Sequence, residues 1–191
     1  MPKLNLGCGA FKKEGYINLD ISLDFKPDVV HDLNKFPYPF SDNTFDFIEA
    51  DHVIEHLNEP FKAIEELHRI SIRGGFIVIR VPHFSRGFTH PEHRRGFDVS
   101  LPYYFSPACG KYIEDIFTKI PVMELKSMKL NWLAQPYLKK EVLPSLFYYL
   151  ALGFSKIVNF FANLSPMFCS RFWCFYVGGF EEIEFIFEVK K

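Results

Sequence analysis

The segments Leu4-Asn5-Leu6-Gly7-Cys8-Gly9 and Gly15-Tyr16-Ile17-Asn18-Leu19-Asp20 decide the fold. The first is a short apolar run that ends in a tight glycine turn, and the second is a short strand that ends on a carboxylate. Glycines after a first strand let the backbone approach a ligand, and a carboxylate after a second strand can accept both hydroxyls of a ribose. Gly7, Gly9 and Asp20 fit those roles, although a purely structural turn would use the same glycines.

Five more strand-like segments follow, at residues 29–30, 45–50, 76–81, 122–130 and 183–189. Two helices are predicted between them. One is capped by Asn58 and stopped by Arg73-Gly74-Gly75, and the other begins at Ser106-Pro107. Strands that alternate with helices favour an open α/β sheet, in which ligands lie beyond the carboxyl ends of the strands.

Composition narrows the class of protein. A chain of 191 residues, with 48% apolar residues and 23 phenylalanines, fits one globular domain over residues 1–191. The formal charge of -1 gives no excess of cations for a phosphate backbone, so we expect no nucleic-acid partner. Four cysteines without CxxC spacing, and a first strand at Leu4 that leaves no room for a leader, predict reduced thiols and a cytoplasmic protein.

Residues 4–9 and 15–20 together resemble the first motif and second strand of class I S-adenosylmethionine-dependent methyltransferases. His31-Asp32-Leu33 is similar to the adenine-side acidic segment of that family, and residues 38–48 are similar to its PF-D-SFD-I segment. His52-Val53-Ile54-Glu55-His56-Leu57 and Arg73-Gly74-Gly75 continue the match in order. The resemblance implies a Rossmann-like open, mostly parallel seven-stranded sheet with helices on both faces, and S-adenosylmethionine as cofactor.

The resemblance also implies a set of cofactor-binding residues. The glycine turn would contact the amino-acid portion, Asp20 the ribose, Asp32 with Leu33 the adenine, and the end of the fourth strand the sulfonium. Asn5 stands where many members carry an acidic residue. The full set is Asn5, Gly7, Cys8, Gly9, Asp20, Asp32, Leu33, Asp51 and His52.

Only eleven positions separate Gly9 from Asp20, about half of the ~20 expected in a dinucleotide fold with a full crossover helix. The spacing predicts a shortened first helix. It also disfavours NAD, because a pyrophosphate needs the complete glycine fingerprint and a helix amino-terminus.

Histidines and arginines concentrate after the fourth and fifth strands. His52, His83 and His90 are the candidate catalytic bases, because imidazole titrates near neutrality. Four further side chains are candidates for acceptor binding, the two arginines for an anionic group: His56, His93, Arg94 and Arg95. Each of these side chains could equally hold loops together.

His52 to His56 also matches the H-x-x-E-H pattern of one group of zinc peptidases. We regard a zinc peptidase as a remote alternative, because the pattern directly follows a strand. His83, His90 and His93 lack a cysteine or carboxylate at familiar spacing, so no metal is predicted.

A long insertion, residues 131–179, precedes the last strand. We expect a helical, aromatic-rich lid whose stripe Leu143, Phe147, Leu150, Phe154, Ile157 and Phe161 faces the core. The alternative is an interaction surface, with peripheral membrane contact through residues 142–170. A membrane span is disfavoured by Pro144, Lys156 and Pro166. The tail, residues 171–191, loosely resembles small methyltransferases linked to polysaccharide synthesis.

The sequence therefore predicts a methyltransferase that acts on a hydroxyl of a glycan, lipid-linked or small-molecule acceptor. A non-catalytic module that binds S-adenosylmethionine is the second hypothesis. Positioning of the acceptor against the methyl group can supply much of the rate enhancement. Oligomeric state and acceptor identity stay open at this stage.

Overall fold

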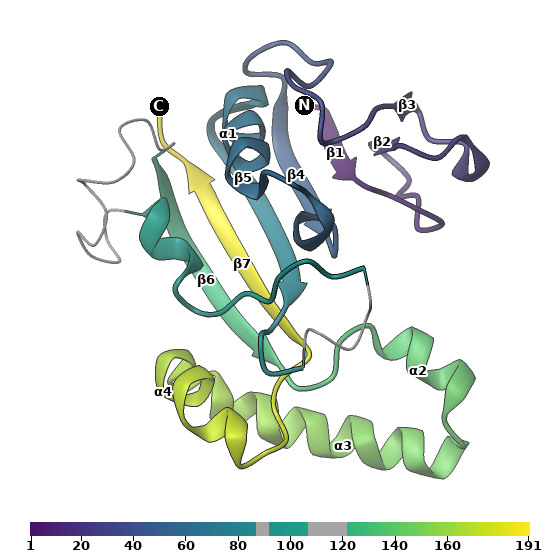
Figure 1. The fold of residues 1–191 in the computed structure, drawn as a ribbon, viewed down its shortest axis with the longest axis vertical. Coiled ribbons are helices and arrows are strands. Elements are labelled where there is room, and N and C mark those ends of the chain that lie inside the picture. Colours follow the sequence, from purple (N-terminus) through teal and green to yellow (C-terminus); the bar gives the residue numbers. More distant parts are fainter. Residues whose placement is uncertain (87–91, 107–121) are drawn as a thin grey trace.

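Seven strands form one sheet in the computed structural model, which describes residues 1–86, 92–106 and 122–191. The order across the sheet is β3-β2-β1-β4-β5-β7-β6 (Figure 1). Only β7 runs antiparallel to its two neighbours, β5 and β6. The predicted mostly parallel seven-stranded α/β sheet is thereby confirmed. The strands are β1 (Lys3–Leu6), β2 (Tyr16–Asp20), β3 (Val29–Val30), β4 (Phe45–Asp51), β5 (Ser71–Pro82), β6 (Met123–Asn131) and β7 (Glu182–Val189).

One helix, α1 (Pro60–Ile70), connects β4 to β5 and packs on the sheet. It begins one residue later than predicted, because Pro60 takes the first helical position and Glu59, not Asn58, is the N-cap residue. It also ends before Arg73-Gly74-Gly75, at Ile70, since Ser71 is already extended and pairs with Phe45. The predicted glycine turn is instead an excursion within β5, where Gly74 has φ of 78°.

The two faces of the sheet differ in chemistry. Ile48 of β4 stands beside Ile77 of β5, which stands beside Phe187 of β7, and all three are fully buried on the α1 side. The next row on the opposite face is polar, where Arg80 bonds Glu184 at 2.8 Å and Glu49 at 3.2 Å. The apolar core therefore lies between α1 and one face. The second predicted helix, from Ser106-Pro107, lies outside the described residues.

The connection from β1 to β2, residues 7–15, holds no helix, so the shortening is more complete than the spacing predicted. Side chains of the two strands satisfy this loop instead. Asn5 donates to the Phe11 carbonyl at 3.0 Å and to the Asn18 side chain at 2.9 Å. The Asn18 oxygen also accepts from the Lys13 backbone at 2.8 Å. Two buried amides thus hold the loop on the polar face of the sheet.

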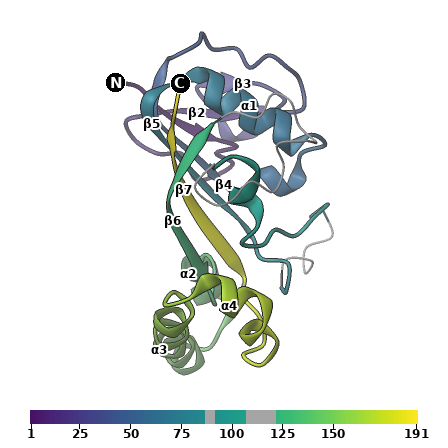
Figure 2. The ribbon, with the colours of Figure 1, turned by 90° about the vertical axis from the view of Figure 1, so that its left-hand side faces the viewer.

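The insertion between β6 and β7 is helical, as predicted. It contains α2 (Pro136–Val142), α3 (Ser145–Ala162), α4 (Pro166–Arg171) and the 3-10 turn η6 (Trp173–Phe175). Figures 1 and 2 show α3 lying across one end of the sheet, transverse to β6 and β7 and far from both chain termini. The insertion therefore forms a separate layer beyond the strand ends.

The core-facing stripe predicted for α3 is wrong. Phe147, Leu150, Ile157 and their predicted companions are exposed to solvent. The buried side chains are Tyr148, Ser155, Val158 and Ala162. Polar groups on this inner side bond the edge strand and the residue after it: Asn163 pairs with both backbone groups of Leu130, and the Asn159 oxygen accepts from the Trp132 N–H at 2.8 Å. The helix is held to the sheet by these amides together with the buried Val158 and Ala162, and not by the predicted stripe.

Replacing Asn163 by alanine should destabilise this layer. Its side chain accepts from Leu130 N–H at 2.8 Å and donates to Leu130 C=O at 2.9 Å. Leaving those groups without a partner should lower the free energy of unfolding by about 1–3 kcal/mol. Urea unfolding would measure it, with Lys156→Ala on the exposed side of the same helix as control. A loss no larger than that of the control would contradict this role.

Candidate functional site

A cavity of about 480 Å³ opens at the carboxyl ends of β1, β2 and β4. Its lining mixes acceptor groups with apolar side chains, as expected of a small-molecule site. Sequence reasoning identified six of these residues as site residues: Gly7, Asp20, Asp32, Leu33, His52 and His56. It missed four apolar and three polar ones: Ile21, Phe25, Val53, Leu57, His31, Asn34 and Glu92. The lining residues are Gly7, Asp20, Ile21, Phe25, His31, Asp32, Leu33, Asn34, His52, Val53, His56, Leu57 and Glu92.

Asp20 is fixed at the end of β2 by two backbone donors. Its Oδ2 accepts from the Gly9 N–H at 2.8 Å, and its Oδ1 accepts from the Ser22 N–H at 2.9 Å. Each carboxylate oxygen has further lone-pair capacity. The carboxylate is therefore oriented at the cavity wall with acceptor sites for a pair of hydroxyls.

The glycine turn brings backbone close to the cavity. Gly7 and Gly9 have φ of 62° and 47°, a conformation that side chains disfavour. A Cβ on Gly7 would lie 2.3 Å from Val53 Cγ2, so only glycine lets Val53 close against the turn. A Cβ on Gly9 would meet nothing within 4 Å. The turn is thus closely packed at Gly7, and it has open space beside Gly9.

Four predicted cofactor residues lie outside the cavity lining: Gly9, whose surroundings are described above, and Asn5, Cys8 and Asp51. Asn5 is buried and spends both amide hydrogens on Phe11 and Asn18. Cys8 is buried and donates its backbone N–H to the Leu19 carbonyl. Asp51 lies on the polar face of the sheet, 3.4 Å from Arg80 Nη1. These side chains support the turn and the sheet, and the prediction that they contact the cofactor is corrected.

His52 is unsuited to act as a base. Its Nε2 lies 2.8 Å from Glu182 Oε2, and its Nδ1 lies 3.3 Å from Glu55 Oε1. Burial alone would lower the pKa of His52, but these two carboxylates outweigh burial and raise the pKa to about 10. The imidazole is therefore protonated at neutral pH and cannot accept a proton. Glu182, which no local sequence pattern indicated, completes this arrangement from β7.

His83 is also unsuited to proton transfer with an acceptor. Its side chain is fully buried, with Nδ1 2.7 Å from Ser85 Oγ and Nε2 2.9 Å from Ser170 Oγ. Burial lowers the pKa of His83 to about 4. It joins β5 to α4 and is a core residue, so its catalytic assignment is corrected. His90 lies outside the described residues, so its assignment stays a prediction.

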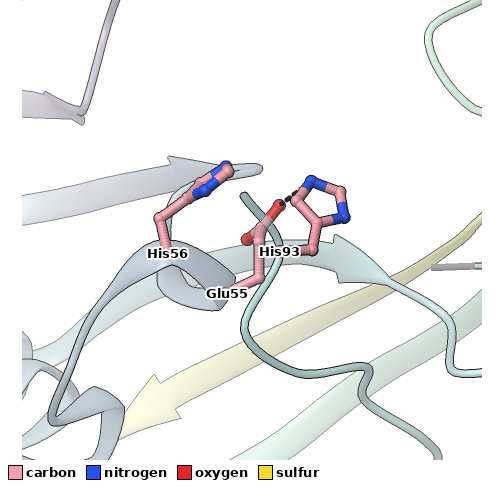
Figure 3. Close-up of side chains that lie close together, drawn as sticks. All are labelled: Glu55, His56 and His93. Atoms are coloured by element: carbon pink, nitrogen blue, oxygen red, sulfur yellow. Dashed lines mark ion pairs between the residues drawn. The ribbon is translucent and has the colours of Figure 1, made fainter. Parts of the chain in front are cut away.

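Glu55, His56 and His93 point toward one another (Figure 3), with potential ligand atoms within 4.8 Å of each other. Asp51, His52 and Glu182 form a second such group. These are the groups among the described residues that could hold a metal ion. His56 belongs to the first group and His52 to the second. The two histidines of the H-x-x-E-H pattern therefore do not converge on one ion, and the zinc-peptidase alternative loses its geometric basis.

The two arginines lie beside the cofactor cavity rather than in its lining. Arg94 donates from its side chain to the Asn58 amide oxygen, and Arg95 approaches the Asn58 carbonyl at 3.4 Å. The Asn58 N–H in turn donates to the side chain of Asn34, which lines the cavity. Their contacts brace the loop before α1, and a role in acceptor binding stays a prediction.

A second cavity, of about 600 Å³, has an aromatic lining. Segments 54–61 and 92–97 contribute residues to both cavities. His56 and Glu92 line the first cavity, and Phe61 and Phe97 line the second. Asp98 and Arg171 add an ion pair of 2.9 Å. The complete lining is Phe61, Phe84, Gly96, Phe97, Asp98, Ser100, Leu101, Tyr104, Arg171 and Phe175.

Comparison with known proteins finds a match for the segment that lines the first cavity. Residues 4–79, which supply most of its lining, match the sequence profile described as methyltransferase domain. The match covers less than half of the chain. A curated relative, an uncharacterised methyltransferase of Schizosaccharomyces pombe, is 32% identical over 57 residues, which are 30% of this chain and 20% of the relative. The chain thus covers a fifth of that relative's length.

Solved structures agree on the fold of the methyltransferase domain. A SAM-dependent methyltransferase from Archaeoglobus fulgidus superposes with a TM-score of 0.53 at 16% identity, covering 98% of this chain and 85% of that one. The [4+2]-cyclase SpnF gives 0.58 at 16% identity, covering 99% and 74%. These structures confirm the predicted Rossmann-like fold, and the match of residues 4–79 agrees with the predicted class I methyltransferase and with S-adenosylmethionine as its cofactor.

The described residues fit that cofactor. S-adenosylmethionine carries no phosphate, and the turn of the methyltransferase domain leads into no helix that would hold one. Asp20 offers paired acceptors for the ribose, and Leu33, Phe25 and Leu57 offer apolar surface for a flat base. Gly9 leaves room for the amino-acid portion. The acceptor group is not identified by these contacts.

His83 should make the stability of the methyltransferase domain depend on pH. Its pKa falls from 6.5 in the unfolded chain to about 4 in the fold, so below pH 6.5 the unfolded chain binds a proton that the folded chain refuses. Stability should therefore fall between pH 6.5 and 4, by up to about 3 kcal/mol. Urea unfolding across this range would measure the loss, and NMR titration of the ring would measure the pKa. A ring that titrates near 6.5 would contradict it.

Proposed function

We propose that the protein transfers the methyl group of S-adenosylmethionine to a hydroxyl of an acceptor with an apolar body. The observation that carries the proposal is the convergence of the glycine turn and the Asp20 carboxylate on one cavity, within a segment that matches the methyltransferase domain. The bound cofactor would supply a methyl group on a positively charged sulfur. The protein's part is to orient the acceptor and receive its proton.

Electrostatics at the carboxyl end of β4 favour a cationic cofactor. Two carboxylates, Glu55 and Glu182, surround the single imidazolium of His52. The pKa of Glu182 would be raised by its burial, but its bonds from His52 and Asn131 lower it overall. The group therefore carries a formal excess of negative charge beside the cavity. A positively charged sulfur is stabilised there and a free anion is not.

His56 is our candidate for the base. It lines the cofactor cavity, and its Nδ1 lies 3.3 Å from the Glu92 carbonyl oxygen. A carbonyl accepts only from a protonated nitrogen, so in the neutral ring Nδ1 carries the proton and Nε2 carries the lone pair. With S-adenosylmethionine bound to supply the methyl group, Nε2 would take the proton that the acceptor hydroxyl loses. Products are the methyl ether and S-adenosylhomocysteine.

The second cavity supports an acceptor with an apolar or aromatic body. Phenylalanines and Tyr104 dominate its lining, and Asp98 with Arg171 supply the polar contacts. A lipid-linked precursor or an aromatic small molecule suits such a wall better than an unmodified glycan, which offers mostly hydroxyls. We therefore favour a lipid-linked acceptor among the classes that the sequence left open.

A non-catalytic role is the second candidate, and one comparison favours considering it. The SpnF cyclase has this fold but is named for a different reaction, so the fold alone does not decide the chemistry. Incubating the protein with S-adenosylmethionine and extracted lipids, then measuring S-adenosylhomocysteine, separates the two. Cofactor binding without turnover would favour the binding module.

Replacing Asp20 by asparagine should weaken cofactor binding at least about tenfold, because a charge-assisted bond to a ribose hydroxyl is lost. Calorimetry with S-adenosylhomocysteine would measure the affinity. Asp24→Asn is the matched control, because Asp24 is an exposed carboxylate of the next turn and lies outside the cavity lining. Unchanged affinity in Asp20→Asn would refute the assignment of this residue.

Replacing His56 by glutamine should lower kcat about 100-fold or more while leaving cofactor affinity within a few fold, because only proton acceptance is removed. The variant should also lose the rise of kcat with pH that titration of a base produces. The control is His31→Gln, which alters another histidine of the same cavity. A His56→Gln enzyme with the pH profile of the parent would rule out the base.

A further inference from the structure

The outer face of α3 is apolar, although the helix is bound to the protein by its opposite side. Buried residues lie along one side of the helix, and Ser155 is among them. The exposed side carries large apolar side chains over its whole length. Those exposed by at least 49% are Leu146, Phe147, Tyr149, Leu150, Phe154, Ile157, Phe160 and Phe161.

The positions of these side chains form one continuous stripe. At about 100° per residue, Leu146, Leu150 and Ile157 lie within roughly 40° of one another, directly opposite Ser155. Monomeric soluble proteins rarely expose contiguous apolar patches larger than a few hundred Å². The helix α3 therefore directs its amides toward the protein and its apolar stripe toward solvent, whereas a surface helix usually does the reverse.

Exposed aromatic residues continue beyond the helix. Phe168 and Phe172 of the α4 region stack with ring centroids 5.6 Å apart, and both are exposed. Phe175 is 68% exposed and at the same time lines the aromatic cavity. The apolar surface formed by α3, α4 and η6 therefore reaches the mouth of the second cavity.

Charge within residues 142–180 has one sign. These residues contain no aspartate or glutamate, and their cations are the exposed Lys156 and Arg171, of which Arg171 pairs with Asp98. Beside them, at the end of α2, Lys140 and Glu141 are both exposed. Cations that flank an apolar stripe complement anionic lipid headgroups.

The orientation of α3 agrees with binding in the plane of a bilayer. Its 18 residues form the single helix among the described residues that is long and apolar enough to cross a membrane. However, Asn159 and Asn163 bond the backbone of residues 130–132, so the helix lies flat across the sheet end (Figures 1 and 2). A bound interfacial helix exposes one face to lipid and keeps the other on protein.

We propose that the surface formed by α3, α4 and η6 docks in the plane of an anionic lipid bilayer, with the stripe Leu146, Leu150 and Ile157 inserted between the headgroups. The inference deepens the proposed function, because the docked surface would place the mouth of the aromatic cavity at the membrane. It does not depend on catalysis, so it can be tested without an acceptor.

Vesicle sedimentation with the full chain tests the proposal. Vesicles of phosphatidylcholine with about a third phosphatidylglycerol should bind the protein more tightly than phosphatidylcholine alone, by roughly fivefold for each lysine at the surface. Leu150→Asp with Ile157→Asp should lower the partition coefficient at least about tenfold. Both side chains are 59% exposed, so the fold should survive, as circular dichroism would verify.

Two controls separate insertion from general stickiness and from charge. Leu23→Asp with Val122→Asp changes exposed apolar residues outside α3, α4 and η6 and should leave binding unchanged. Lys140→Gln with Lys156→Gln should remove the preference for anionic vesicles. S-Adenosylhomocysteine affinity of every variant, by calorimetry, should match the parent, which keeps this test separate from that of the proposed methyl transfer.

Three results would overturn the proposal. The parent protein stays in the supernatant with both kinds of vesicle. The parent is a dimer in solution that Leu150→Asp with Ile157→Asp converts to a monomer without vesicle binding, which would make the stripe a contact between copies. Bound protein resists alkaline carbonate extraction, which would mean that α3 spans the bilayer.

Discussion

The hydrogen bond from the Gly9 N–H to the Asp20 carboxylate ties the ends of β1 and β2 together, and the cofactor cavity depends on it. A connection without a helix has few backbone partners of its own. Asn5 and Asn18 supply the missing ones on the polar face, and Asp20 supplies them at the strand ends. The strands themselves therefore build the turn. A ligand then meets a surface that is already in place.

The same logic explains the polar face of the sheet. Where α1 covers the strands, every second side chain is apolar and buried. On the other face, Arg80 of β5 pairs with Glu49 and Asp51 of β4 and with Glu184 of β7. Such ion pairs add little stability individually when they are part-exposed. Their arrangement instead fixes the register of β4, β5 and β7, whose ends carry His52, His83 and Glu182.

Local patterns in the sequence predicted the strands, the glycine turn and the acidic residue at the end of β2, because those features repeat on a scale of a few residues. Contacts between residues far apart in the sequence cannot be predicted from such local patterns. The state of His52 depends on Glu182, which is 130 positions away, and the burial of His83 depends on Ser170 of the insertion. Periodicity also identified α3 as amphipathic but could not say which side faces the sheet.

The helical insertion begins and ends beside His52, which lines the cofactor cavity. Asn131, the last residue of β6, donates to Glu182, the first residue of β7, at 2.6 Å, and Glu182 holds His52. Beside them, Glu181 accepts from the Ala134 N–H at 2.8 Å and from Arg86 at 2.6 Å. The first and last residues of the insertion are thus hydrogen-bonded to each other and to the strand ends. A tilt of the helical layer would move Glu182, and with it His52, through these two hydrogen bonds. The position of the layer is therefore coupled to the charge beside the cofactor cavity.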